Sequence, residues 1–304
     1  MELSPGSRRH TGLLMAAAMM TLVPSYAFLT ANLPTIVEMG AIEILYDEHI
    51  NYGSYLVQNA PINLVRFAVL LFMLFAYQRG EVAINKSLLA SCEAPTWTYK
   101  QRLLLFVLMC AIILWATDTW HGIAPAWIAL TVATVLLFPG FGFFREQAMK
   151  TEIDFSVAFL IASVFGISAV MTEIGLGEQI AEFVAPTLGL GQSDNSLWDL
   201  TAIVGFSSAL SHLTIAPATP IVLAPLAASM SEATGWPVTS VAMAHNIGYS
   251  TTFLPYQSPP LLIGIALAQI PIGALTRLCL VSATVTSVIG IPLTWILWVG
   301  LDLI

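Results

Sequence analysis

The chain has 304 residues, of which 57% are hydrophobic and 9% are charged, with a net charge of −8 and a mean hydropathy of +0.82. A soluble domain carries about 25% charged residues. The composition therefore excludes an ordinary soluble protein and indicates an all-α polytopic membrane protein. Cys92, Cys110 and Cys279 lack the spacing of a disulfide framework or a metal-binding motif, so we expect free thiols.

The N-terminal stretch "SRRHTGLLMAAAMMTLVPSYA" has two interpretations. Its basic start, its short apolar run and the small residues near Ala27 are typical of a cleaved signal peptide. The same residues also fit a first membrane span over 11–37 that is interrupted at Pro24 and Pro34.

A crossing needs about 20 apolar residues, and on this basis the sequence predicts seven crossings and one re-entrant helical hairpin. The crossings are expected near 11–37, 61–78, 102–117, 123–138, 154–172, 238–272 and 276–300, and the hairpin at 198–230. We expect three regions: a broken helix with an external loop over 1–60, connecting and scaffold-type helices over 61–153, and a second repeat over 154–304.

Lys and Arg residues set the orientation expected for these crossings. They lie before the first span, in the loops near 79–102 and 145–150, and at the start of the last span, whereas the other loops contain acids only. All basic loops face one side only if 198–230 enters and leaves on the other. We therefore expect the plasma (inner) membrane, with a cytoplasmic N-terminus, an external C-terminus and a hairpin that opens outward.

The stretch "TTFLPYQSPPLLIG" contains three prolines within six positions of a predicted span. Proline removes a backbone donor and blocks helical bonding by the carbonyl four residues earlier. In a transporter such a broken helix presents carbonyls to a cation and first-turn amides to an anion. The expected groups are the carbonyls of Thr251, Pro255 and Tyr256 and the amides of Leu261, Leu262 and Ile263, from a helix that restarts at Pro260. A simple proline kink is the alternative.

The hairpin "SSALSHLTIAPATPIVLAP" also places polar side chains beside helix-breaking prolines, and the alternative is ordinary hydrogen bonding between helices. His212 and His245 are either proton carriers or buried histidines with satisfied hydrogen bonds, and Asn246 either orients a ligand or joins two helices. No Asp, Glu or Lys lies deep inside any predicted span, and Arg66 and Asp118 are expected near span ends. Proton relays use such residues, so we expect Na⁺ as the coupling ion.

Four stretches resemble the divalent anion:Na⁺ symporter family, which includes the sodium–dicarboxylate and sodium–sulfate transporters. They are "FLTANLPTIVEMG" (28–40), "WATDTWHGIAPAWIALTVATVLLFPG" (115–140), "GISAVMTEIGLGEQIAEF" (166–183) and "FLPYQSPPLLIG" (253–264). The first and last resemble the broken helices of the two repeats in that family, which favours a span at the N-terminus.

Two departures from the family pattern stand out. The family hairpin carries Ser-Asn-Thr followed by Ala-Thr, and here only Ala218 and Thr219 match when Pro225 is the anchor, whereas a shifted alignment uses Ser211, His212 and Thr214. The family also has a hairpin in each repeat, and only one is expected here. The sequence is therefore expected to be a fragment, one half of a split protein or a shortened variant.

The resemblance implies Na⁺-coupled symport of a small dianion, such as a dicarboxylate, citrate or sulfate, by an elevator-type homodimer. The implied Na⁺ ligands are Ser25, Thr30, Ala31, Asn32, Thr219, Leu254 and Gln257. The implied substrate contacts are Asn32, Thr35, Thr214, Thr219, Ser258 and Pro259. We expect no catalytic residues, no organic cofactor and no nucleic-acid partner.

Other classes of protein fit less well. Ser211 and His212 are adjacent, and adjacent helical side chains point about 100° apart, which disfavours an intramembrane serine protease. "GEVAINKS" lacks the second glycine of a phosphate-binding loop. The main alternative is a truncated or non-transporting membrane subunit that needs a separate N-terminal half.

Overall fold

A computed structural model describes residues 8–77, 97–138, 173–192, 195–214, 218–268 and 270–304, with a few separate residues between 159 and 170. Every regular element in these ranges is a helix. Three of the described helices are long and apolar enough to cross a membrane: α3 (Tyr52–Tyr77), α5 (Tyr99–Ala116) and α16 (Ile272–Gly300). The expected all-α polytopic membrane fold is confirmed.

The chain forms two compact units, and the smaller one comprises residues 1–2, 51–54 and 80–160. Within it α5 packs against α7 (Pro125–Leu137), and the four-residue α6 (Asp118–His121) lies between them in the sequence. A capping box between Thr98 and Gln101 begins α5, which satisfies backbone groups of its first turn. The Asp118 carboxylate accepts a hydrogen bond from the Tyr52 backbone N–H.

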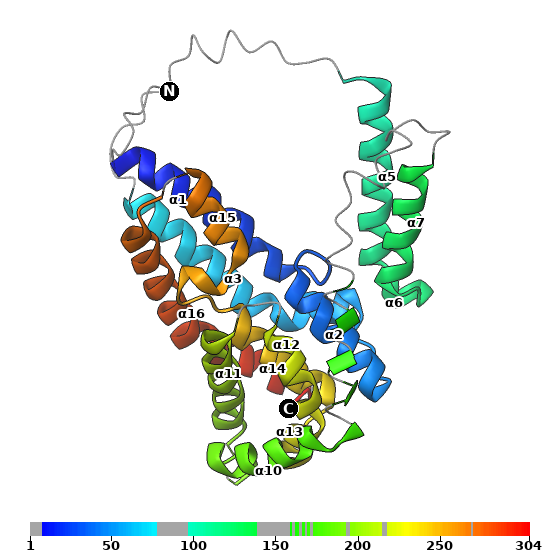
Figure 1. Ribbon diagram of the computed structural model, residues 1–304, viewed down its shortest axis with the longest axis vertical. Helices are drawn as coiled ribbons and strands as arrows, with labels where there is room; N and C mark the ends of the chain where they lie inside the picture. Colours follow the sequence, from blue (N-terminus) through cyan, green and yellow to red (C-terminus); the bar gives the residue numbers. More distant parts are fainter. Residues whose placement is uncertain are drawn as a thin grey trace. The chain divides into compact units, whose positions relative to one another are not determined.

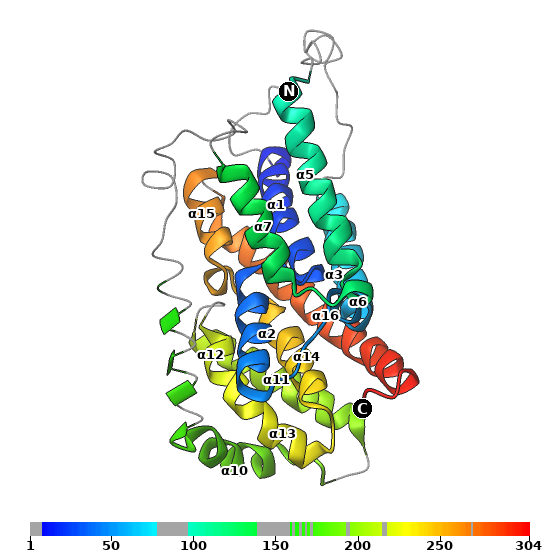
Figure 2. The same cartoon turned by 90° about the vertical axis from the view of Figure 1, so that its right-hand side faces the viewer.

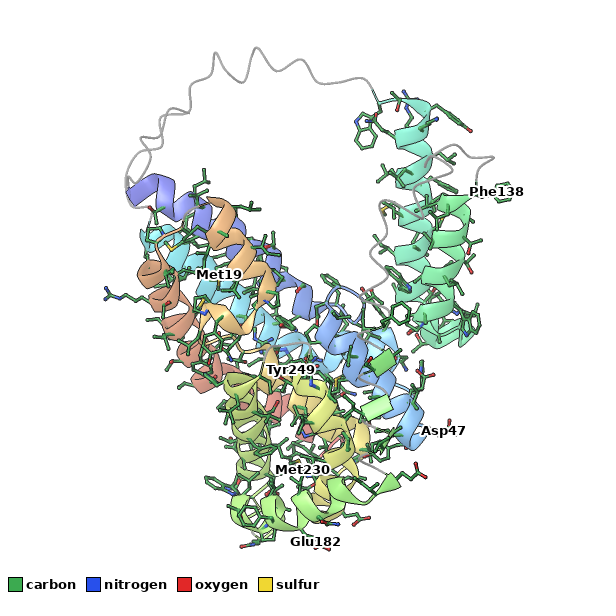
Figure 3. The ribbon with its side chains drawn as sticks, in the orientation of Figure 1. Met19, Asp47, Phe138, Glu182, Met230 and Tyr249 are labelled. Carbon is green, nitrogen blue, oxygen red and sulfur yellow. The ribbon has the colours of Figure 1, made fainter. Side chains whose placement is uncertain are left out.

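The larger unit comprises residues 3–50, 55–79 and 161–304, and its core joins helices that are far apart in the sequence. Its first helix, α1 (Arg8–Leu22), packs against α15 (Pro259–Ala268), as Figure 1 shows. Met19 and Tyr249, both labelled in Figure 3, belong to one buried cluster that also includes residues of α3 and α16. Burial of such apolar side chains fixes the helices against one another.

The two expected helix breaks are present. At the first break, the 3₁₀ helix η1 (Val23–Ala27) follows α1, and α2 (Leu33–Tyr46) comes after it. In the second break, α14 (Val238–Ser250) is separated from α15 by the 3₁₀ helix η4 (Pro255–Gln257). Both interruptions coincide with the prolines from which they were predicted, because proline cannot donate a helical hydrogen bond.

Several predicted boundaries are wrong. The loop expected over 38–60 is mostly helix, because α2 continues to Tyr46 and α3 begins at Tyr52. The loop expected over 173–197 contains α10 (Leu176–Leu188). Both errors have one cause: acidic residues favour a loop in the sequence, but here several of them lie within helices. The crossing predicted at 154–172 lies almost entirely outside the described residues.

The segment predicted as a hairpin turns back on itself. It is built from α11 (Ser196–Leu213), α12 (Thr219–Leu223), the 3₁₀ helix η3 (Ala224–Leu226) and α13 (Ala227–Thr234). The last helix returns to the start, because α13 packs against α10, the helix that precedes α11. Both views show α10 and α13 together at one end (Figure 2).

Helix α14 lies at the centre of the larger unit, where it packs against α2, α11 and α13. It approaches α11 closely at Gly248, where an added methyl carbon would lie 2.5 Å from both Ser207 Cβ and the Val204 carbonyl oxygen. Such separations are too short for ordinary packing, so glycine is needed here for helix contact. A small residue at a helix crossing is typical of membrane proteins.

We predict that Gly248→Ala destabilises the protein by about 1–3 kcal/mol, because the methyl group must displace α11 backbone or side-chain atoms. Gly205→Ala on α11 is the matched control, since a methyl group there meets no atom within 4 Å. The measurement is thermal unfolding of each purified variant in detergent. A Gly248→Ala protein that melts with the wild type would contradict this account of the α11–α14 contact.

We also predict that both ends of the hairpin lie on the external side of the membrane. Reporter fusions at Asn195 and Gly235 should give the same external signal, because α13 returns to the helix before α11. Opposite signals from the two fusions would make the segment a full crossing.

Candidate functional site

At the first break, one amide side chain forms hydrogen bonds with the backbone on both sides of the interruption. Asn32 precedes α2 and its Oδ1 accepts a hydrogen bond from the Thr35 backbone N–H at 3.0 Å. Its Nδ2 donates to the Ser25 carbonyl oxygen in η1, also at 3.0 Å. The Ser25 hydroxyl donates to the Leu22 carbonyl at 2.6 Å. Ser25 and Asn32, two residues predicted for the first cation site, therefore lie together with Thr35, a predicted substrate contact, across the break.

The other two residues predicted at this break lie in its linker. The Ala31 backbone N–H donates to the Phe28 carbonyl at 3.1 Å, and Thr30 is half-buried. The linker thus forms a turn between η1 and α2, with its carbonyls close to the Asn32 cap.

The second break is closed in a similar way by Gln257. Its Oε1 accepts from the Leu254 backbone N–H at 2.7 Å, and its Nε2 donates to the Ser211 hydroxyl of α11 at 2.8 Å. The Tyr256 hydroxyl also donates to the His212 carbonyl, at 2.7 Å. The break is therefore attached to the hairpin by two side chains. Ser258 is buried, and its hydroxyl has no hydrogen-bond partner among the described residues.

The amides predicted to attract an anion at this break are occupied, which corrects the sequence analysis. Helix α15 begins at Pro259, one position earlier than expected, and Pro259 and Pro260 have no N–H. The backbone N–H groups of Leu261 and Leu262 both donate to the Ser258 carbonyl, at 3.0 and 3.2 Å. An anion would have to be held by side chains elsewhere.

In the hairpin, the hydroxyls of Thr214 and Thr219 are 2.7 Å apart, so α12 begins against the end of α11. Thr219 is fully buried. Because α12 also packs against α2, this pair of predicted site residues lies in the same unit as the first break.

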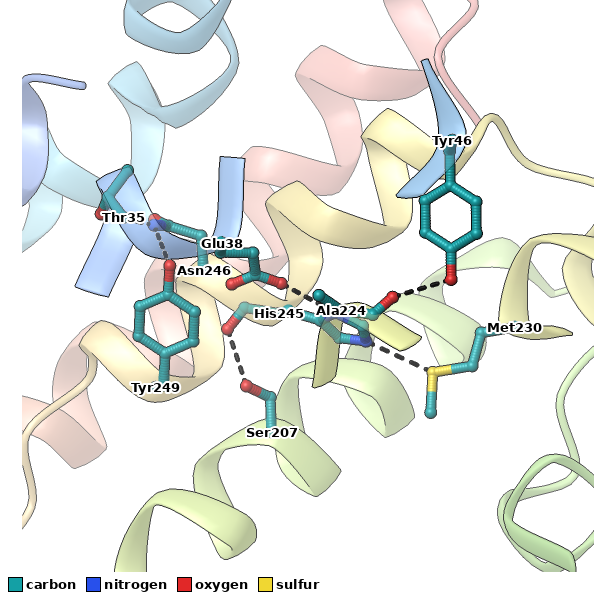
Figure 4. A network of polar contacts seen from close by, with 9 residues as sticks. All are labelled: Thr35, Glu38, Tyr46, Ser207, Ala224, Met230, His245, Asn246 and Tyr249. Atoms are coloured by element: carbon teal, nitrogen blue, oxygen red, sulfur yellow. Dashed lines mark hydrogen bonds and ion pairs between the residues drawn. The ribbon is translucent and has the colours of Figure 1, made fainter. Parts of the chain in front are cut away.

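Helix α14 connects the first break to α3 through Asn246. Its Nδ2 donates to the Thr35 hydroxyl at 2.9 Å and to the Tyr249 hydroxyl at 2.8 Å, and its Oδ1 accepts from the Tyr55 hydroxyl at 3.3 Å. The Tyr55 hydroxyl also lies 2.9 Å from the Tyr26 carbonyl in η1. Of the two readings of Asn246, the structure shows the one that joins helices (Figure 4).

One turn further along α2, the Glu38 carboxylate meets His245 of α14 in a fully buried pair (Figure 4). Glu38 Oε1 and His245 Nδ1 are 3.0 Å apart, and neither side chain has solvent exposure. The Glu38 Oε2 atom has no hydrogen-bond partner among the described residues, and His245 Nε2 faces the Met230 sulfur at 3.4 Å. Buried ionisable groups are costly inside a membrane and mark ion or substrate paths.

This pair corrects the expectation that no acid lies deep inside the protein. Sequence reasoning placed Glu38 in a loop, whereas it lies in the second turn of α2 with no exposed surface. A signal was available: Thr35, Glu38 and Ile42 follow helical spacing after Pro34, so they share a face of any helix that starts there.

Arg66 was expected near the end of a span, and it instead lies deep within α3 and is 5% exposed. It donates hydrogen bonds to Asn63 Oδ1, the Ile247 carbonyl and the hydroxyls of Ser250 and Thr251, at 2.7–3.0 Å. All four acceptors are neutral. The guanidinium thus fastens α3 to the start of the second break.

A comparison with protein-family models matches residues 4–248 to the family described as citrate transporter. The matched range holds the first break, the hairpin and most of α14. A search of curated proteins gives no match. The coarser expectation of a family of anion transporters, rather than of enzymes, is supported, while the narrower resemblance to divalent anion:Na⁺ symporters stays a prediction.

Proposed function

Because this chain belongs to the citrate transporter family, we propose that it carries a citrate-like anion across the membrane by symport with a cation. The observation that supports coupling of anion transport to a cation is the buried Glu38–His245 pair, which can hold a proton between α2 and α14. Both helices adjoin a break, so a change in the charge of the pair acts where the chain is already interrupted.

Electrostatics gives a reason for coupling to a cation. Each elementary charge that crosses a membrane potential of 100 mV changes in energy by about 2.3 kcal/mol. An anion entering a cell with a negative interior moves against that field. A proton carried on Glu38–His245 offsets one of its charges, and a second cation would offset another.

Na⁺ is the second candidate, and it rests on the oxygens of the two breaks. The buried Ser258 hydroxyl has no partner among the described residues, and it follows Gln257 in the break. Hydroxyl and carbonyl oxygens are the ligands of Na⁺ sites in discontinuous helices. The proposed Na⁺ ligands stay those expected from the sequence: Ser25, Thr30, Ala31, Asn32, Thr219, Leu254 and Gln257.

The proposed substrates are citrate first and then the other small anions expected from the resemblance, dicarboxylates and sulfate. Basic residues flank the first span and fill loops on one predicted side, which supports a plasma (inner) membrane location with a cytoplasmic N-terminus and an external C-terminus. A homodimer is part of the same proposal and rests on the family resemblance alone.

We predict that a proton gradient drives citrate uptake by liposomes containing the purified chain, and that Glu38→Gln abolishes this proton-driven accumulation of citrate. One pH unit corresponds to about 1.4 kcal/mol per proton, or roughly tenfold accumulation. The amide can still accept a hydrogen bond from His245 but cannot release a proton, so citrate–citrate exchange should persist while accumulation is lost. The measurement is uptake of labelled citrate under a proton gradient alone, a Na⁺ gradient alone, both or neither.

Glu43→Gln is the matched control, because Glu43 lies on the same helix with half of its side chain exposed. It should behave as the wild type. Accumulation that follows Na⁺ alone and survives Glu38→Gln would reject the proton and support the Na⁺ ligands. Competition by unlabelled citrate, succinate and sulfate ranks the substrates. No uptake or exchange under any gradient would support the non-transporting subunit instead.

A further inference from the structure

Arg66 is a buried cation whose charge is not neutralised by the described residues around it. The buried acid of this core, Glu38, is paired with His245, and the four hydrogen bonds of Arg66 go to neutral groups. Removing a charge from water is expensive unless an opposite charge accompanies it. The neutral acceptors orient the guanidinium but leave its positive charge without a counter-ion.

The same guanidinium lines a cavity beside both helix breaks. Residues from the end of α1 and from η1 form one wall, including Tyr26, and Ser250, Thr251 and Thr252 form another. Helix α16 closes the cavity with Ser282, Ala283 and Thr286. The cavity measures about 30 Å³, which is room for roughly two water molecules. That volume suits one carboxylate group and excludes a whole citrate.

One polar group in this cavity lacks a hydrogen-bond partner among the described residues. Thr286 is 1% exposed and lines the cavity, and its hydroxyl has no hydrogen-bond partner among the described residues. A buried hydroxyl without a partner is costly. A cation and an unpartnered donor that share one small cavity are the two features that a carboxylate needs.

We propose that Arg66 and Thr286 bind one carboxylate group of the transported anion. This inference rests on the proposed function for the identity of the ligand. Arginine is permanently charged and binds carboxylates through charge-assisted N–H bonds, and the Thr286 hydroxyl donates a further bond. The rest of the anion extends from the cavity toward the breaks. The site recognises carboxylate chemistry, so it selects against a neutral group of the same shape.

The test is binding to the purified full chain in detergent, measured by calorimetry with citrate and with an analogue in which one carboxylate is replaced by a carboxamide. The wild type should bind citrate more tightly than the amide by about ten- to a hundredfold, the value of a charge-assisted hydrogen bond. Arg66→Met should weaken citrate binding by that factor and leave amide binding nearly unchanged. If Arg66→Met loses the preference for citrate but still binds the amide analogue, the variant is folded and the loss is one of carboxylate recognition.

Thr286→Val and Thr294→Val form a matched pair on α16. Both hydroxyls are buried without partners among the described residues, but only Thr286 lines the cavity. Valine has nearly the same shape as threonine, so neither change should harm folding. Thr286→Val should weaken citrate binding by roughly ten- to a hundredfold, the range for a hydrogen bond to a charged group, and Thr294→Val should have no effect.

Three outcomes would overturn the proposal. One is an unchanged preference for citrate over the amide in folded Arg66→Met protein. Another is equal citrate binding by the two threonine variants. The third is a result in which chloride raises the melting temperature of the wild type but not of Arg66→Met, while citrate binds equally well to both proteins. That result would assign the cavity to a small inorganic anion. If citrate binding depends on Arg66 but the liposomes show no transport, the proposed function is rejected and the proposed carboxylate site is still supported.

Discussion

Backbone groups at membrane depth need hydrogen-bond partners, and each broken helix of this protein meets the need with one amide side chain. Asn32 bonds to backbone groups on both sides of the first break, and Gln257 joins the second break to α11. An amide suits this task because it carries both a donor and an acceptor. Non-helical backbone is tolerated in a membrane only where protein or a watery cavity surrounds it, so these side chains make the breaks possible.

The polar core built around these breaks has two electrostatic parts, and both contact α14. His245 faces Glu38 of α2, and the carbonyl of Ile247 with the hydroxyls of Ser250 and Thr251 holds Arg66 of α3. The first part contains both an acid and a base, so it can be neutral overall. The second keeps a positive charge. One part is therefore suited to exchanging a proton, and the other to holding an anion.

The prolines made the breaks predictable, because their effect on helical hydrogen bonding is local and depends on sequence alone. The distribution of Lys and Arg predicts a re-entrant hairpin; α13 does return to α10, and the side of the membrane on which both ends lie stays a prediction. The pairing of Glu38 with His245 was not predicted, because the two residues are 207 positions apart in the sequence. The same holds for Arg66, whose contacts on α14 and beyond it lie 181 to 185 positions away. A single sequence shows local chemistry, whereas these pairings depend on helix packing.

The spacing along α14 makes the two parts electrostatically dependent on each other. His245 and Ser250 are five residues apart, which corresponds to a rise of about 7.5 Å. Two unit charges on the order of 10 Å apart, with an effective dielectric constant of about 20, interact by roughly 1.7 kcal/mol. A proton added to Glu38–His245 would thus favour an anion beside Arg66 by more than about tenfold. Linkage requires the reverse as well, since a bound anion raises the proton affinity of the pair by the same factor. In the proposed mechanism, proton binding and anion binding would therefore favour each other through electrostatic attraction alone, without any movement of the helices.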